Sequence, residues 1–288
     1  MVDRLSDLER RFPNERFGIT GNIISNLLST VAICPLSEIV CIKEYLMDPE
    51  IACKRLDSKE VKAALDLRAA EINKWTISDY QKFYSNPTTK CIWSARSSDN
   101  VDDTYYSYSE SLMICNGLLM YQMENSVDEF KKSLVSILES SVPRLNCMVI
   151  VSPPSAGKNF YFDGIRDYFM NAGQMNNSIG TYPFAYQDCC NKRIIFWNGP
   201  NYESSQLKKL KKLFAGDDLR FDVKYEPQAI VKRTPVIVLC NSEPAFVRHA
   251  EFRDSVVMYR WKAAPYLKDF DKKPLPTACV DILFNKDL

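Results

Sequence analysis

A short apolar run followed by glycine and lysine is the part of this sequence most directly suited to chemistry. The candidate loop follows the run 147–151, precedes a helical pattern over 160–170, and consists of Ser152, Pro153, Pro154, Ser155, Ala156, Gly157, Lys158 and Asn159. At such a turn, backbone N–H groups and the helix N-terminus cradle phosphates, and the lysine reaches the β and γ phosphates. The segment predicts a phosphate-binding loop. The alternative is an ordinary strand-to-helix turn with a solvated lysine.

Two positions of this loop depart from the general pattern. Ser152 stands where the pattern has its first glycine, and Asn159 stands where Ser or Thr would hold Mg²⁺. An asparagine amide oxygen is a weaker, neutral ligand for that ion. The loop therefore predicts phosphate binding more directly than metal binding.

Several other kinds of site are excluded by composition. His249 is the only histidine, which excludes metal sites built from several histidines and the paired-histidine motif of rolling-circle nucleases. The ten cysteines include no Cys-x-x-Cys pair, so no zinc site is expected. We expect no protein-held metal centre, and we interpret the histidine as a surface residue.

Net charge and hydropathy limit the kinds of partner that this chain can have. The formal net charge is +1, so any contact with nucleic acid must come from local basic clusters. No apolar run has the length of a membrane-spanning helix, and the first residues lack a signal-peptide pattern. We expect an intracellular protein that is not secreted and has no membrane partner.

The elements that must position the loop follow from apolar periodicity. Runs at 147–151, 194–197 and 236–239 predict buried strands, and 256–261 predicts a fourth, which together indicate an α/β fold. Ser126 and Glu129 form a capping-box pattern before a helical periodicity that ends near Leu138. Residues 1 to about 90 show mixed helical patterning, and the polar segment 97–109 predicts a loop between two parts.

The segment 152–163 resembles the helicase region of parvovirus non-structural initiator proteins, particularly those of arthropod densoviruses, in which asparagine after the lysine is normal. The resemblance continues in order through 182–184, 191–198, 232–238 and 259–265, and more weakly through 33–35 and 75–84. It implies a P-loop, AAA+-like superfamily 3 helicase core over 101–288, with an N-terminal helical linker or oligomerisation region over 1–100. It also implies ATP and Mg²⁺ as cofactors, a homo-oligomeric ring on single-stranded DNA, and a place in the host nucleus, or otherwise in the cytoplasm. By this resemblance we expect the family's upstream nuclease domain to be missing from this sequence, in agreement with the single histidine, either because the sequence is a fragment or because the gene lost that half.

By resemblance, Lys158 is the phosphate-binding lysine, and Asn241 is the catalytic polar sensor that positions the attacking water. The DNA-contacting hairpin of the family corresponds to 215–233, which makes Lys224, Lys232 and Arg233 the candidate DNA-binding residues. Their contacts would be to phosphates and salt-sensitive. A solvated surface is the alternative for Lys232 and Arg233.

Two residues that the family uses in hydrolysis are changed. Gly199 stands where the related proteins have the glutamate that activates water, and Ser255 stands where they have the arginine finger. Glu203 and Arg253 are the nearest substitutes in sequence, and Arg253 would share the face of Ser255 if both lay on a strand. Losing an arginine finger typically lowers turnover about 10³- to 10⁵-fold.

Three hypotheses follow. The first is an ATP-dependent helicase motor that acts in viral genome replication. The second is a weakened or inactive descendant, such as a viral gene captured by a host genome, that acts by binding nucleotide or protein. The third is an interaction protein that binds no nucleotide, against which the retained Gly157, Lys158 and Asn241 argue.

Overall fold

A five-stranded parallel sheet forms the centre of the molecule in the computed structural model, which describes residues 18–94, 100–177, 185–223 and 226–285. The strand order is β4-β5-β8-β3-β9. The strands are β3 (Cys147–Val151), β4 (Ala172–Gln174), β5 (Ile194–Asn198), β8 (Val236–Cys240) and β9 (Val256–Arg260). Every residue of β3 and β8 is buried, as expected for central strands covered on both faces. All four predicted strands are confirmed.

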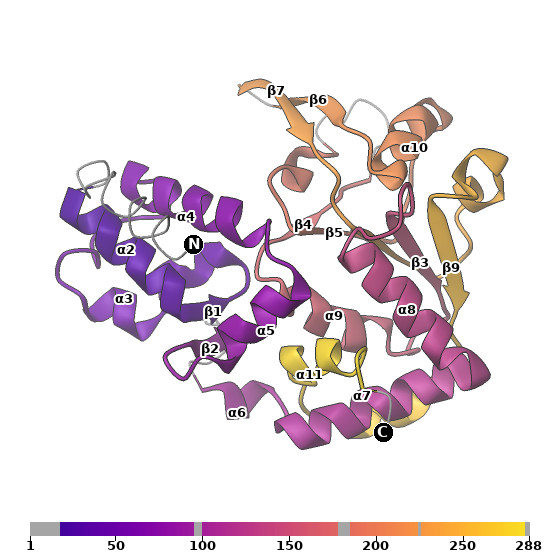
Figure 1. Cartoon of the computed structure of the whole chain (residues 1–288), viewed down its shortest axis with the longest axis horizontal. Helices are drawn as coiled ribbons and strands as arrows, with labels where there is room; N and C mark the ends of the chain where they lie inside the picture. Colours follow the sequence, from indigo (N-terminus) through magenta and orange to yellow (C-terminus); the bar gives the residue numbers. More distant parts are fainter. Residues whose placement is uncertain (1–17, 95–99, 178–184, 224–225, 286–288) are drawn as a thin grey trace, which may run out of the picture.

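Helices cover both faces of this sheet (Figure 1). Met148 and Ile150 of β3 face one core, which contains residues of α7 (Tyr108–Met123), α8 (Val127–Leu138), α9 (Lys158–Tyr168) and α11 (Pro276–Asp281). The alternate β3 residues, Cys147, Val149 and Val151, face a second core that includes α10 (Leu207–Ala215). The two-residue alternation of a strand thus divides its side chains between two apolar layers.

The N-terminal region is mainly helical, as predicted, and lies to one side of the sheet (Figure 1). Its elements are α2 (Gly18–Thr30), η2 (Leu36–Cys41), α3 (Lys43–Met47), α4 (Lys59–Ile72) and α5 (Ile77–Ser85). The sequence did not predict the short parallel pair β1 (Val31–Ile33) and β2 (Lys90–Trp93). The hydroxyl of Tyr80 donates to the carbonyls of Ile72 and Phe169 at 3.0 and 3.2 Å. This buried side chain joins the helical region to the end of α9.

The predicted loop at 97–109 is partly helical. Residues 95–99 lie outside the described part, but α6 (Val101–Thr104) follows, and α7 begins with a capping box between Ser107 and Glu110. The capping box expected at Ser126 and Glu129 is wrong, because Ser126 makes no side-chain cap bond. A 3₁₀ turn, η3 (Glu124–Ser126), leads directly from α7 into α8 and holds Ser126 away from the extended conformation that capping needs.

An antiparallel hairpin, β6 (Leu219–Val223) and β7 (Glu226–Val231), precedes β8. It extends beyond the sheet at the top of Figure 1. Over the described ranges, no helix is both long and apolar enough to cross a membrane.

Candidate nucleotide-binding site

The predicted phosphate loop connects the end of β3 to the start of α9. Ser155 and Gly157 have positive φ angles of 57° and 84°. A Cβ atom at Gly157 would lie 2.4 Å from Cδ1 of Leu267, so the leucine side chain would have to move, and the positive φ angle favours glycine here. The carbonyl of Ser155 accepts a bond from the backbone N–H of Ala264 at 2.9 Å.

A buried glutamine braces the loop from α7. Nε2 of Gln122 donates to the carbonyls of Ala156 and Lys262 at 2.9 and 2.8 Å, and its Oε1 accepts from the Lys262 N–H at 2.8 Å. One amide thereby ties the phosphate loop to the segment after β9. Sequence reasoning missed Gln122, because nothing in the pattern of α7 distinguishes it from a helix residue facing solvent.

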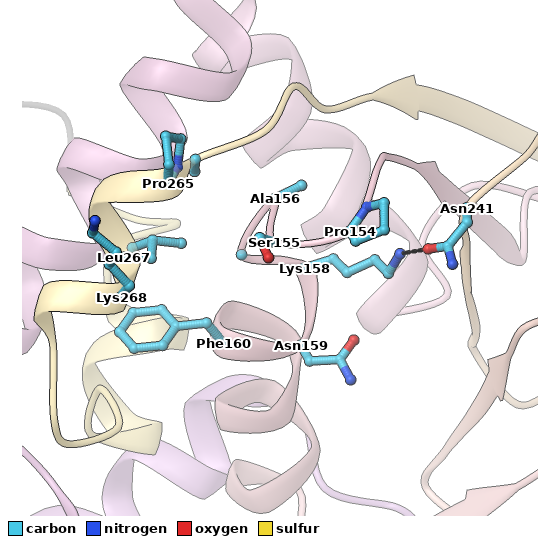
Figure 2. A pocket seen from close by; sticks show the side chains of 12 residues that line it. Pro154, Ser155, Ala156, Lys158, Asn159, Phe160, Asn241, Pro265, Leu267 and Lys268 are labelled. Atoms are coloured by element: carbon cyan, nitrogen blue, oxygen red, sulfur yellow. Dashed lines mark hydrogen bonds between the residues drawn. The ribbon is translucent and has the colours of Figure 1, made fainter.

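Lys158 and Asn241 meet at the carboxyl edge of the sheet. Nζ of Lys158 donates to Oδ1 of Asn241 and, at 3.3 Å, to the carbonyl of Cys240 (Figure 2). The contact arises because β8 lies directly beside β3, so the residues that follow the two strands are neighbours. Burial lowers the pKa of the Lys158 ammonium. A ligand carrying negative charge would oppose that effect by stabilising the charged form.

A pocket of about 600 Å³ opens over the loop. Lys158 extends toward Asn241 on one side of it, and Pro265, Leu267 and Lys268 lie on the other side (Figure 2). Phe160 lines the pocket, whereas the neighbouring Tyr161 and Phe162 are buried. A polar end and an apolar end in one cavity of this size suit a ligand that carries both phosphate and an aromatic base.

Most of the predicted loop residues line this pocket. They are Pro154, Ser155, Ala156, Gly157, Lys158 and Asn159, together with Asn241. Ser152 and Pro153 are not in the lining, and the buried hydroxyl of Ser152 has no hydrogen-bond partner among the described residues. The far wall, Ala264 to Lys268, comes from the segment after β9 and includes η8 (Pro265–Asp269).

The lining contains no carboxylate. Its side-chain oxygens belong to Ser155, Asn159 and Asn241, all of them neutral, and the described residues contain no group of three or more histidine, cysteine or acidic side chains that could hold a metal. The site therefore fits phosphate better than a metal held by protein ligands alone. A divalent ion would have to be carried chiefly by phosphate oxygens and water.

Gly199 lies at the carboxyl edge of the sheet, where an acidic residue could activate a water molecule. It follows β5, has φ of +59°, and donates its N–H to the carbonyl of Leu239 at 2.8 Å. A Cβ atom there would meet nothing within 4 Å. Glu203 is exposed, precedes η5 (Ser204–Gln206), and is not among the residues that line the pocket.

Ser255 lies at the amino end of β9, on the edge opposite the phosphate loop. It is 2% exposed, and its hydroxyl donates to the carbonyl of Phe252 at 3.2 Å. Arg253 is exposed in a turn after η7 (Ala250–Phe252), so it does not share a strand face with Ser255. Neither residue is placed to contact a nucleotide bound in its own chain's pocket.

The three candidate DNA-binding residues have different environments. Lys224 lies outside the described residues. Arg233 donates its guanidinium to the carbonyls of Val142 and Leu145 at 2.5 and 3.3 Å, and its stem covers Gly216. These contacts give Arg233 a structural role. Lys232 is exposed.

Lys232 borders a basic groove of about 390 Å³ between the end of α4 and the hairpin. The groove lining also includes Lys74 and Lys192, and it contains no acidic residue. Lys192 pairs with Asp188 at 3.0 Å, whereas Lys74 and Lys232 have no ion pair with any residue in the described ranges. The two unpaired lysines are therefore available to an anionic ligand.

A parallel sheet in which an interior strand runs into a glycine-lysine loop, with an asparagine after the adjacent strand, defines a P-loop type of α/β core. The solved structure of JCV helicase has the same fold, with a TM-score of 0.54 over 93% of this chain and 83% of that one at 10% identity. A second JCV helicase structure gives a TM-score of 0.52. The fold is thus α/β, with an N-terminal helical region, as predicted, and it is the fold of JCV helicase.

The relatives narrow this class. The family model of the parvovirus non-structural protein NS1 matches residues 118–257. The initiator protein NS1 of Diatraea saccharalis densovirus is 35% identical over 87% of this chain and 47% of that protein, and the one from Junonia coenia densovirus gives the same values. The Bombyx mori densovirus protein is 36% identical over 67% of this chain and 23% of its own length. The chain is a parvoviral NS1-like protein, and it spans just under half the length of the first two relatives.

Proposed function

We propose that this chain binds ATP in the pocket over the phosphate loop and acts as the helicase-type motor part of a parvoviral replication initiator, with hydrolysis weakened or lost. The observation that carries the proposal is the contact between Lys158 and Asn241, next to a loop in which Gly157 has a positive φ angle. Titration of the purified chain with ATP tests it directly. Failure to bind any nucleotide would support the interaction-protein hypothesis instead.

Each part of the pocket has a separate role in this proposal. The N–H groups at the start of α9 and the Lys158 ammonium hold the phosphates. Phe160 and Leu267 pack against the base, and Asn241 orients a water molecule near the terminal phosphate. Mg²⁺, when bound with ATP, would neutralise phosphate charge. In the first turn of α9, the amide oxygen of Asn159 is the side-chain oxygen available to this ion.

Weak hydrolysis follows from what the site lacks. Activation of water needs a base within hydrogen-bond reach, and neither Gly199 nor any residue of the pocket lining supplies a carboxylate. Ser255 supplies no cation to a neighbouring copy. Binding depends on other groups, the loop amides and Lys158, so it can persist without turnover.

A captured, catalytically inactive binding protein is the second candidate, and the same two changes favour it. Measurable turnover, or assembly on single-stranded DNA without turnover, favours the first candidate, because the second acts only by binding nucleotide or protein. Assembly into a ring on single-stranded DNA and a place in the nucleus belong to the first candidate. So does a division into a helical region over 1–100 and a motor domain over 101–288.

The buried position of Ser255 leads to a prediction about stability. Ser255→Arg is expected to lower the free energy of unfolding by about 3 kcal/mol and not to restore an arginine finger, because a large charged side chain would replace a buried hydroxyl. Ser255→Ala, which removes only the bond to Phe252, should cost about 1 kcal/mol. Urea unfolding of both variants provides the measurement. An arginine variant as stable as the alanine variant would show that the side chain reaches solvent.

The basic groove leads to a prediction about DNA. The double variant Lys74→Ala/Lys232→Ala is expected to weaken binding of single-stranded DNA and to reduce the slope of log K against log salt by about 1.4, because each lysine neutralises one phosphate. Lys208→Ala/Lys212→Ala on α10 removes the same charge from an exposed helix face and is the matched control. Equal loss in both double variants would assign the effect to net charge alone.

A further inference from the structure

Three charged side chains form a cluster at the same sheet edge as the phosphate loop. Oε1 of Glu243 accepts from Nε of Arg248 at 3.0 Å, and its Oε2 pairs with NH2 of Arg260. The side chains of Arg248 and Arg260 are 75% and 61% exposed, whereas that of Glu243 is 19% exposed. One carboxylate shared by two guanidinium groups leaves the cluster with a net positive charge.

The strand order fixes where this cluster lies. β8 and β9 flank β3 on its two sides, and Arg260 at the end of β9 is in register with Val151 at the end of β3. Glu243 follows β8 by three residues. The ion pair between Arg260 and Glu243 therefore crosses the end of β3, at the point where the phosphate loop begins.

Backbone bonds hold both flanks at this point. The N–H of Ser152 donates to the carbonyl of Cys240 at 3.0 Å, and the N–H of Trp261 donates to the carbonyl of Val151 at 2.9 Å. Arg260 directly precedes Trp261, and Glu243 lies two residues beyond Asn241. The two strand ends that lead to these charged residues are thereby held beside the loop, and the side chain of Arg260 is largely exposed.

We propose that Arg260 binds the terminal phosphate of a nucleoside triphosphate in its own chain, leaving Glu243 when the triphosphate is present. The inference rests on the proposed nucleotide binding, and it names the group that distinguishes triphosphate from diphosphate. Lys158 and Asn241 mark the phosphate end of the pocket, and Arg260 is a cation on the neighbouring strand at this same edge. A guanidinium matches phosphate oxygens in a bidentate geometry.

General electrostatic arguments favour the exchange in which Arg260 leaves Glu243 and binds a terminal phosphate. Arg260 is 61% exposed in this ion pair, and a pair with one well-solvated partner contributes little to stability. A terminal phosphate carries more negative charge than one carboxylate and offers three oxygens. Glu243 is then a positioning residue, which holds Arg260 near the loop until the triphosphate arrives.

The position of Arg260 is relevant to the arginine finger, whose place in the sequence is held by Ser255. In some P-loop enzymes the arginine that stabilises the transferring phosphate belongs to the same chain, not to a neighbour. Ser255 supplies no such cation from the amino end of β9. Arg260, at the carboxyl end of the same strand, is in a position to provide it within one chain.

The alternative is that the ion pair between Arg260 and Glu243 is purely structural. The two interpretations predict opposite effects of Glu243→Gln on the affinity for an ATP analogue. If Arg260 binds phosphate, Arg260→Gln should lower affinity for a non-hydrolysable ATP analogue about tenfold and leave ADP affinity within about twofold. Glu243→Gln should raise affinity for the analogue about threefold, because it releases the arginine. A purely structural ion pair predicts that both substitutions lower the affinity for both nucleotides.

The test measures binding of the ATP analogue and of ADP, each with Mg²⁺, to the full chain and to Arg260→Gln, Glu243→Gln and Arg248→Gln. Arg248→Gln is the matched control, because it removes an arginine from the same carboxylate but from a different element, η6 (Ala245–Arg248). It should leave the ratio of the two affinities unchanged. An unchanged ratio in Arg260→Gln, or a loss of analogue binding in Glu243→Gln, would overturn the inference while leaving nucleotide binding intact. No binding of either nucleotide by the unmodified chain would overturn the proposed function together with this inference.

Discussion

Lys158→Ala is expected to lower the affinity of the chain for ATP by about 100-fold, roughly the effect of removing two charge-assisted hydrogen bonds to phosphate. Nζ of Lys158 is held at the phosphate end of the pocket by Asn241 and the carbonyl of Cys240, so its position is set before a ligand binds. Calorimetric titration with ATP provides the measurement. The fold should be unaffected, because the ammonium contributes no apolar contact to either core.

The matched control for this variant is Lys268→Ala. Lys268 lines the other end of the same pocket and is exposed. Its loss should change ATP affinity much less than the loss of Lys158. Equal effects of the two substitutions would mean that net charge around the pocket, and not a phosphate contact, governs binding.

Gly199→Glu is expected to raise the rate of ATP hydrolysis about 100-fold, the effect typical of a positioned general base. The backbone of Gly199 is bonded to Leu239, one residue before the carbonyl that accepts from Lys158, and the space beside its Cα is open. The left-handed backbone at this position should cost about 1 kcal/mol of stability for any side chain.

Two neighbouring variants separate chemistry from backbone strain. Gly199→Gln has the size of the glutamate variant without its charge, and Gly199→Ala carries only the backbone cost. Both should unfold at slightly lower urea concentration than the unmodified chain and remain as slow in hydrolysis. Faster turnover in the glutamine variant would exclude a general base at this position.

The sequence predicted the sheet well, because its central strands are covered on both faces and are therefore continuous apolar runs. The runs at 147–151 and 236–239 each became a buried strand, and their adjacency explains why Lys158 and Asn241 meet. The strand-to-helix turn was also predictable, and the glycine of its glycine-lysine pair is where the structure has a positive φ angle that favours glycine.

Other parts of the site depend on contacts that the sequence pattern does not contain. Gln122 and Leu267 reach the loop from distant segments, and no local periodicity marks them. Arg233 looked like a free cation in sequence, but in the fold its guanidinium serves two backbone carbonyls. Ser255 proved to be buried at the far edge of the sheet, which periodicity alone could not show.

The most direct test of the central claim measures ATP binding and steady-state ATP hydrolysis on the same preparation of the unmodified chain, with and without single-stranded DNA. We predict binding of one ATP per chain, weakened about 100-fold in Lys158→Ala, with turnover about 100-fold slower than in Gly199→Glu. Rapid, DNA-stimulated hydrolysis by the unmodified chain would contradict the account, because it would require a base that the described pocket does not contain.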